Sequence, residues 1–190
     1  MVDQDELLAA EVRRRAGHYE ILGETYAKFE FFENGWNSYS RFLDVDKVDL
    51  ILRQKSSGKR IYREVQVKFG KLYPVGSAWE RELFDFTSWR FFKEDEFAAH
   101  VGQDDFFVAY VLARDIGYRG DIFIFPIRAF VQAIRGGISS KGQRKVYISR
   151  LRGNDERWVL RRLGRFKEVT DATCLDLSKY RRNFAALLDR

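Results

Sequence analysis

The sequence of 190 residues is poor in the residue types on which several common chemistries depend. It contains one cysteine, so an internal disulfide is excluded and a reducing compartment is favoured. Its two histidines, His18 and His100, do not have the spacing of a ligand pair, and no zinc cluster is present. Because Cys174 lies in a segment typical of a short strand, we expect its thiol to be packed rather than reactive.

Long apolar runs are also missing. No stretch approaches the length of a membrane span, and the charged N-terminal segment lacks the apolar core of a signal peptide. The sequence therefore predicts a cytoplasmic protein with no membrane partner. The absence of repeats and of Pro- or Ser-rich linkers favours a single domain over residues 1–190. No P-loop, GxGxxG motif or Ser-His-Asp grouping supports a kinase, a dinucleotide-binding protein or a serine hydrolase.

Aromatic and basic residues are plentiful. The 17 Phe and 9 Tyr mostly fall on periodic stretches, which is typical of a bulky core. The net charge is +6, and basic residues are concentrated between positions 135 and 165. This segment is either a solvated basic face or a surface that binds the phosphates of DNA. The candidate phosphate contacts are Arg144, Lys145, Arg150, Arg152, Arg161 and Arg162.

Hydrophobic periodicity and turn residues predict an α/β domain, with helices flanking a mixed β-sheet. Helices are expected at 5–34, 77–92, 127–135 and 177–188, and strands at 36–42, 47–53, 60–68, 106–112, 121–125, 146–151 and 157–161. The two glycines of the first helix, Gly17 and Gly23, leave an interruption there open. Trp79 and Trp89 would lie on the second helix, where packing in the core is favoured over stacking on bases.

Two consecutive predicted strands carry the polar residues that phosphodiester cleavage requires. Glu64, Gln66 and Lys68 alternate along one strand, so they share a face. Asp49 lies in an otherwise apolar strand, where a carboxylate is costly unless it is paired or ligates a metal. Magnesium held by such residues neutralises charge on the phosphate, and a neighbouring lysine orients the attacking water. The alternative interpretation is a salt bridge between Asp49 and Lys68 across the hairpin.

Three short segments combine these residues in a familiar order: Gly23-Glu24-Thr25-Tyr26, Val48-Asp49-Leu50-Ile51 and Val65-Gln66-Val67-Lys68. Over residues 20–70 the sequence thereby resembles the PD-(D/E)XK nuclease superfamily, in which a helix bears Glu, a strand ends in Asp and the next strand carries (D/E)-x-K. Some members have Gln at the acidic position. The resemblance implies a restriction endonuclease-like fold and an endonuclease that cuts DNA with Mg²⁺ or Mn²⁺. It further implies that Glu24, Asp49 and Gln66 hold the metal, that Lys68 positions the water, and that a homodimer forms.

The helical metal ligand has rivals. Gln66 is neutral and binds a hard cation less well than Glu would, so a second carboxylate is needed. Glu24 can provide it, but Glu20 lies one turn earlier on the same helix and is the main alternative. Glu64 is a lesser candidate, because it shares the face of Gln66.

Other assignments also stay open at this stage. Asp44 and Asp46 are alternatives to Asp49, although they look more like turn residues. The protein could also be a non-catalytic DNA-binding or assembly protein that keeps this fold, or a basic structural domain of a larger complex. Metal-dependent cleavage of a plasmid distinguishes the first function from these two.

Overall fold

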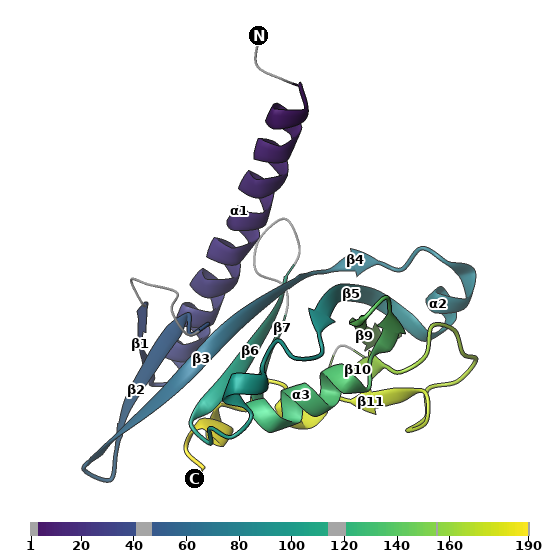
Figure 1. Cartoon of the computed structure of the whole chain (residues 1–190). Coiled ribbons are helices and arrows are strands. Elements are labelled where there is room, and N and C mark those ends of the chain that lie inside the picture. Colours follow the sequence, from purple (N-terminus) through teal and green to yellow (C-terminus); the bar gives the residue numbers. More distant parts are fainter. Residues whose placement is uncertain (1–3, 41–46, 114–120, 155, 190) are drawn as a thin grey trace.

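A computed structural model of the chain describes residues 4–40, 47–113, 121–154 and 156–189, and the side chains of its first helix from residue 17 onward. The helices are α1 (Gln4–Glu33), α2 (Ala78–Leu83) and α3 (Ile127–Arg135), with 3-10 turns at Ala98–His100, Ser178–Tyr180 and Phe184–Leu187. The strands are β1 (Asn37–Ser40), β2 (Leu50–Ser56), β3 (Lys59–Lys71), β4 (Tyr73–Pro74), β5 (Phe84–Lys93), β6 (Phe106–Ala113), β7 (Asp121–Pro126), β8 (Ile138–Ser140), β9 (Gln143–Leu151), β10 (Trp158–Arg161) and β11 (Cys174–Asp176). They form two sheets (Figure 1).

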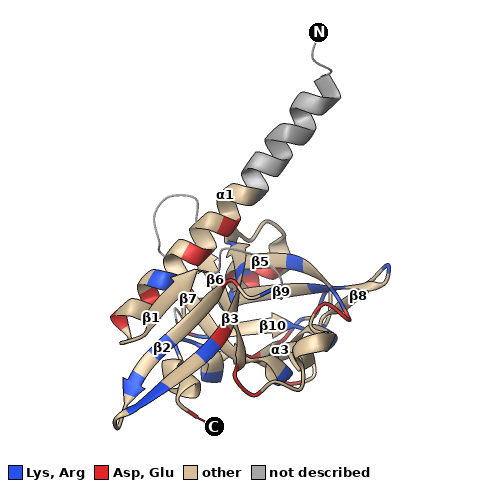
Figure 2. Ribbon diagram, turned by 60° about the vertical axis from the view of Figure 1, so that its left-hand side comes forward, with Lys and Arg blue, Asp and Glu red and all other residues tan. Residues whose placement is uncertain are grey.

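The first sheet is mixed, with the order β1-β2-β3-β6-β7. Only β3 and β6 pair in parallel, and the other neighbours are antiparallel. Ser57 and Gly58 join β2 to β3, both with positive φ (49° and 79°), as the right-handed twist of a tight hairpin requires. Helix α1 packs on β3 and β6. Figure 2 shows acidic residues along α1 and basic residues along the β2–β3 hairpin.

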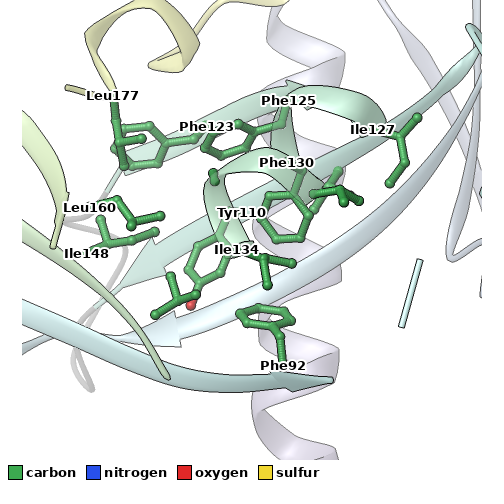
Figure 3. Packing of buried hydrophobic residues seen from close by; sticks show 14 of the residues in the cluster. Phe92, Tyr110, Phe123, Phe125, Ile127, Phe130, Ile134, Ile148, Leu160 and Leu177 are labelled. Carbon is green, nitrogen blue, oxygen red and sulfur yellow. The ribbon is translucent and has the colours of Figure 1, made fainter. Parts of the chain in front are cut away.

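The second sheet is antiparallel, with the order β11-β10-β9-β5-β4 and β8 added on β9. It packs against the first sheet through a cluster of buried apolar side chains. Figure 3 shows the aromatic centre of this cluster, where Phe130 of α3 lies among Phe92, Tyr110 and Phe125. The ring centroids of Phe130 and Phe92 are 5.5 Å apart, in an edge-to-face arrangement. The abundance of phenylalanine therefore serves the core, as predicted.

The predicted α/β class and mixed sheet are confirmed, but the second sheet was not expected. The predicted helix over 77–92 is largely wrong, because α2 ends at Leu83 and β5 follows at once. Aromatic residues along β5 alternate between a buried and an exposed face, and pairing with β9 outweighs the capping signal at Ser77. The helix does begin where this signal places it, with Ser77 at the N-cap, but the Ser77 hydroxyl donates to the Glu80 side chain at 2.6 Å and does not cap the helix backbone.

At the ends of the chain, one predicted helix is wrong and the other is confirmed. The predicted helix over 177–188 is wrong, since two 3-10 turns replace it. Arg182 lies between them with φ at 47°, and its guanidinium donates to both carboxylate oxygens of Glu30 on α1. Helix α1, in contrast, continues through Gly17 and Gly23 without interruption. None of the helices described is both long and apolar enough to pass through a membrane.

Candidate active site

The site begins where β2 stops pairing with β3. The last β2 pair engages Val65, whereas β3 continues along β6 as far as Lys71. Beyond Val65, the backbone N–H of Val67 donates to Asp49 Oδ2 at 2.6 Å, so a side chain takes over the role of the neighbouring strand. Asp49 is thus fixed at an open strand edge. Its rivals Asp44 and Asp46 lie outside the described residues.

A cleft of about 330 Å³ opens at this edge, between α1, β3 and the segment that follows β5. It is lined by all four residues that the sequence predicts to be catalytic: Glu24, Asp49, Gln66 and Lys68. Glu20, the main rival of Glu24, lines it too, whereas Glu64 does not. The structure therefore brings the predicted residues together, and it leaves the choice between Glu20 and Glu24 open.

The two helical carboxylates reach the cleft because α1 lies unusually close to β3. A Cβ atom at Gly23 would be only 2.9 Å from the Cβ of Phe69, a separation that side chains essentially never adopt. Glycine at this position lets the helix approach the strand. Glu24 also forms an ion pair of 3.6 Å with Lys28, one turn further along the helix.

Gln66 is the most unusual residue of the cleft. Its side chain is buried, with 6% of its surface exposed, and its Oε1 atom has no hydrogen-bond partner among the residues that the structure describes. An unpartnered buried carbonyl oxygen is costly, and it is also the kind of ligand that a hard divalent cation accepts. In the described part of the chain, no three Asp, Glu, His or Cys side chains form a metal-binding group. A mixed donor set with the carboxylate of Asp49 and the amide of Gln66 fits a magnesium ion chemically.

Lys68 lies on the same face of β3 as Gln66 and is also buried, with 8% of its surface exposed. Its Nζ is 3.1 Å from Glu96 Oε1. Burial is the largest influence on the Lys68 ammonium and lowers its pKa, while Glu96 and, more weakly, Asp49 act to raise it. Asp49 therefore interacts electrostatically with Lys68 across the hairpin, in addition to the ion pair between Lys68 and Glu96.

Sequence reasoning missed three charged residues that line the cleft: Lys47, Arg90 and Glu96. Arg90 extends from β5 and donates to the backbone carbonyl of Phe69 at 3.3 Å, so it satisfies the open edge of β3 beyond Val67. Glu96 follows β5 and pairs with Lys68. The mistaken helix over 77–92 hid Arg90, because strand alternation is needed to place it on the inner face beside Phe92.

The predicted phosphate-contacting residues do not form one surface. Side chains alternate between the two faces along β9. Arg144 and Arg150 therefore point to one face of the second sheet, and Lys145 points to the other. Arg144 pairs with Glu94 at 2.5 Å, and Arg150 pairs with Asp85 at 3.4 Å. The remaining members are Arg152, which donates to the Arg81 carbonyl at 2.9 Å, and Arg162, which is exposed.

Arg161 has to be removed from this set. It is 1% exposed, and it donates to Glu80 Oε1 at 2.5 Å and to Ser149 Oγ at 2.8 Å. Its guanidinium also lies 4.4 Å from the centroid of the Phe84 ring. The prediction that Arg161 contacts phosphate is therefore wrong, because α2 and its partners enclose the charge within the protein.

The two tryptophans behave differently from each other. Trp79 packs edge to face on Phe166, with centroids 5.5 Å apart, which confirms the packing interpretation for this residue. Trp89 is 47% exposed on β5, so the same interpretation is wrong for it. Cys174 is buried in β11 as predicted, and burial raises the pKa of its thiol.

Comparison with known proteins adds little to this geometry. No model of a protein family matches the chain, and no curated protein does either. Among solved structures, the chain is similar to a bacterial homing endonuclease, I-Ssp6803I, with 14% identity, a TM-score of 0.45 and coverage of 89% of each chain. This similarity is too low to assign a family or an activity.

Proposed function

We propose that the chain is a metal-dependent endonuclease that hydrolyses phosphodiester bonds of DNA, with an active centre of the PD-(D/E)XK type. The observation that carries this proposal is the unpartnered Oε1 of Gln66, buried in a cleft that Asp49 and Lys68 also line. Gln54 carries the same kind of oxygen outside the cleft, so what distinguishes Gln66 is its position beside Asp49 in the cleft. Leaving this oxygen without a donor costs free energy that no contact of the described residues offsets. A divalent cation would offset it.

Each residue of the cleft has a distinct role in this proposal. Asp49 and Gln66 would hold Mg²⁺ or Mn²⁺, together with Glu24 or its rival Glu20 from α1. Such an ion, when bound, would neutralise charge on the phosphate and help to activate a water for attack. Lys68 does not ligate the ion, since its ammonium only donates hydrogen bonds, and it orients the attacking water or the phosphate.

Glu96 determines where the Lys68 ammonium lies. The ion pair of 3.1 Å holds the Nζ at the wall of the cleft, and the side chains of both residues are largely shielded from solvent. An ammonium held in this way is ready to donate without reorganisation, which is the condition for effective electrostatic stabilisation. Glu96 is thus a positioning residue that acts through Lys68.

A second candidate function is a non-catalytic DNA-binding protein with the same fold. It is favoured by the neutral Gln66 and by the absence of a group of three acidic or imidazole ligands among the described residues. The two functions differ in one property, since only the nuclease cuts DNA when a divalent cation is supplied.

The test is a plasmid-nicking assay with Mg²⁺, Mn²⁺ or EDTA, run beside calorimetric titration with Mn²⁺. The unmodified protein should nick DNA only with a divalent cation. Asp49→Asn should lose both cleavage and Mn²⁺ binding, whereas Lys68→Ala should lose cleavage and keep Mn²⁺ binding. Asp104→Asn is the matched control, because Asp104 is an exposed residue paired with Arg128 and does not line the cleft. Full cleavage by Asp49→Asn would eliminate the proposed centre.

The proposal also includes a cytoplasmic location and a homodimer, which would allow both strands of a duplex to be cut. Light scattering on the purified protein measures the oligomeric state directly. A monomer at concentrations that support cleavage would limit each protein molecule to nicking a single strand.

A further inference from the structure

The outer face of the second sheet carries an exposed group of aromatic residues beside the cleft. Trp89 of β5 lies opposite Tyr147 of β9, and Phe91 lies opposite Lys145, so the four side chains share one face. Trp89 and Phe91 are 47% and 40% exposed. We call these four residues the aromatic platform.

Only part of this outer face is covered by the rest of the described chain. Helix α2 and the segment that precedes β11 cover one half, where Trp79 and Phe166 pack over Phe84 and Val159. The other half, with the aromatic platform, stays open to solvent. Other rings of this chain are also exposed, but here the rings adjoin one another on one open sheet face, and such contiguous apolar groups mark binding surfaces.

A lysine lies at the centre of the platform. The Nζ of Lys145 is 4.5 Å from the centroid of Trp89, 4.7 Å from that of Tyr147 and 5.5 Å from that of Phe91. Three rings therefore hold one half-buried ammonium by cation–π attraction. The surface combines aromatic rings with a fixed positive charge, which is the combination that binds bases and their phosphates in single-stranded nucleic acid.

The platform is continuous with the cleft in both directions. One hollow is lined by Trp89, Tyr73 and Lys71, and it shares Phe69 and Arg90 with the cleft. A second hollow is lined by Phe91 and Lys93 and shares Lys47 and Glu96 with the cleft. A nucleic-acid strand whose phosphate lies in the cleft would thus reach the aromatic platform with its neighbouring nucleotides.

From this arrangement we infer that the aromatic platform stacks unpaired bases next to the scissile phosphate, so that the substrate is DNA with a single-stranded segment. This inference rests on the proposed nuclease function. In a continuous duplex each base is stacked between its neighbours, and exposing one costs a few kcal/mol. In a single strand or flap the base faces are free, and the positive charge of Lys145 complements the phosphates between them.

The experiment compares three DNA substrates of the same sequence: a single strand, a duplex and a duplex with a single-stranded flap. Affinity is measured without a divalent cation and cleavage with Mg²⁺. Trp89→Ala should weaken binding of the single strand and the flap about 5- to 100-fold, while binding of the duplex and of Mn²⁺ stays unchanged. Phe32→Ala is the control, because Phe32 is an aromatic ring exposed on α1 that lines no part of the cleft.

The possible outcomes separate this inference from the proposed function. If the protein cuts all three substrates and Trp89→Ala does not change their relative affinities, the platform inference is overturned and the nuclease proposal stands. If no DNA is cut with any divalent cation, the nuclease proposal fails. Even then, tighter binding of the single strand than of the duplex, lost in Trp89→Ala, would support the inference that the aromatic platform stacks unpaired bases. Tighter binding of the continuous duplex would overturn that inference.

Discussion

Asp49 accepts a hydrogen bond of 2.6 Å from the backbone N–H of Val67. Val67 follows Val65, the last residue of β3 that pairs with β2. The carboxylate therefore has two roles in one position. It satisfies an edge N–H of the sheet, and it lines the cleft in which we place the metal. These roles can be separated, because only the second requires a negative charge.

The first prediction compares Asp49→Asn with Asp49→Ala. The Asn carbonyl can still accept from Val67, so the free energy of unfolding should stay within about 0.5 kcal/mol, a typical variation for a substitution that keeps its contacts. Ala leaves that N–H without its acceptor and should cost about 1–3 kcal/mol. Both variants should lose Mg²⁺-dependent cleavage by roughly 10²-fold or more. Urea denaturation and plasmid nicking measure the two effects, and equal stability of the variants would contradict the structural role.

The second prediction concerns the unpartnered oxygen of Gln66. Gln66→Met keeps the shape of the side chain and removes the buried oxygen, so it should raise the free energy of unfolding by about 1 kcal/mol and abolish Mn²⁺ binding. Gln66→Glu should increase Mn²⁺ affinity, because a carboxylate binds a hard cation better than an amide does.

The chain contains a matched control for this prediction. Gln54 of β2 also has a buried Oε1 without a partner, but it lies outside the cleft. Gln54→Met should therefore gain stability in the same way and leave metal binding and cleavage unchanged. Loss of metal binding in this variant as well would mean that Gln66 has no specific role.

The centre of the site could be predicted because its residues lie close together in the sequence. Asp49, Gln66 and Lys68 belong to one hairpin, where a period of two and a short turn determine which side chains share a face. Predicting the position of Glu24 was harder, because it required knowing which strand the helix α1 packs against. Glu24 nevertheless lines the cleft, because α1 packs on β3 and β6.

The rest of the site could not be predicted, because it depends on a second sheet that the sequence signals disguise. Ser77 and Glu80 form a true start of a helix, and nothing local shows that this helix ends after Leu83. Pairing of β5 with β9, about 60 positions away in the sequence, determines where Arg90 and Trp89 point. Long-range strand pairing has no local signature, so Arg90, Glu96 and the aromatic platform became visible only in the fold.

The third prediction compares Arg161 and Arg162, two neighbouring arginines that contribute equally to the net charge but differ in burial. Arg161→Ala should lower the free energy of unfolding by about 3–5 kcal/mol, because it leaves Glu80 without its partner in a largely enclosed ion pair. Arg162 is exposed, so Arg162→Glu should leave stability unchanged. If this end of β10 contacts DNA, the same variant should weaken binding and reduce its dependence on salt. Thermal unfolding and binding titrations at several salt concentrations distinguish the two, and an equally stable Arg161→Ala would contradict the burial of this charge.

The final prediction tests whether the distance between α1 and β3 controls activity. Gly23→Ala would place a methyl group 2.9 Å from the Cβ of Phe69. Phe69 belongs to β3, which is hydrogen-bonded to β6 at this position and cannot easily move. The helix must therefore move away, at a cost of about 1–3 kcal/mol from overpacking. This movement shifts Glu20 and Glu24 together, so cleavage should fall by roughly 10²-fold, whichever of the two ligates the metal.

Gly17→Ala provides the control on the same helix. Among the described residues, no heavy atom beyond the neighbouring turns of the helix backbone lies within 4 Å of the position that its Cβ would occupy. Alanine should stabilise the helix here by about 0.5–1 kcal/mol relative to glycine, and cleavage should not change. If Gly23→Ala behaves in the same way as Gly17→Ala, the close approach of α1 does not position the site. Gly23→Ala could instead lose both cleavage and Mn²⁺ affinity while its circular dichroism spectrum remains that of a folded protein. That result would mean that a carboxylate of α1 binds the metal, and that the glycine at position 23 brings the helix close enough for it to do so.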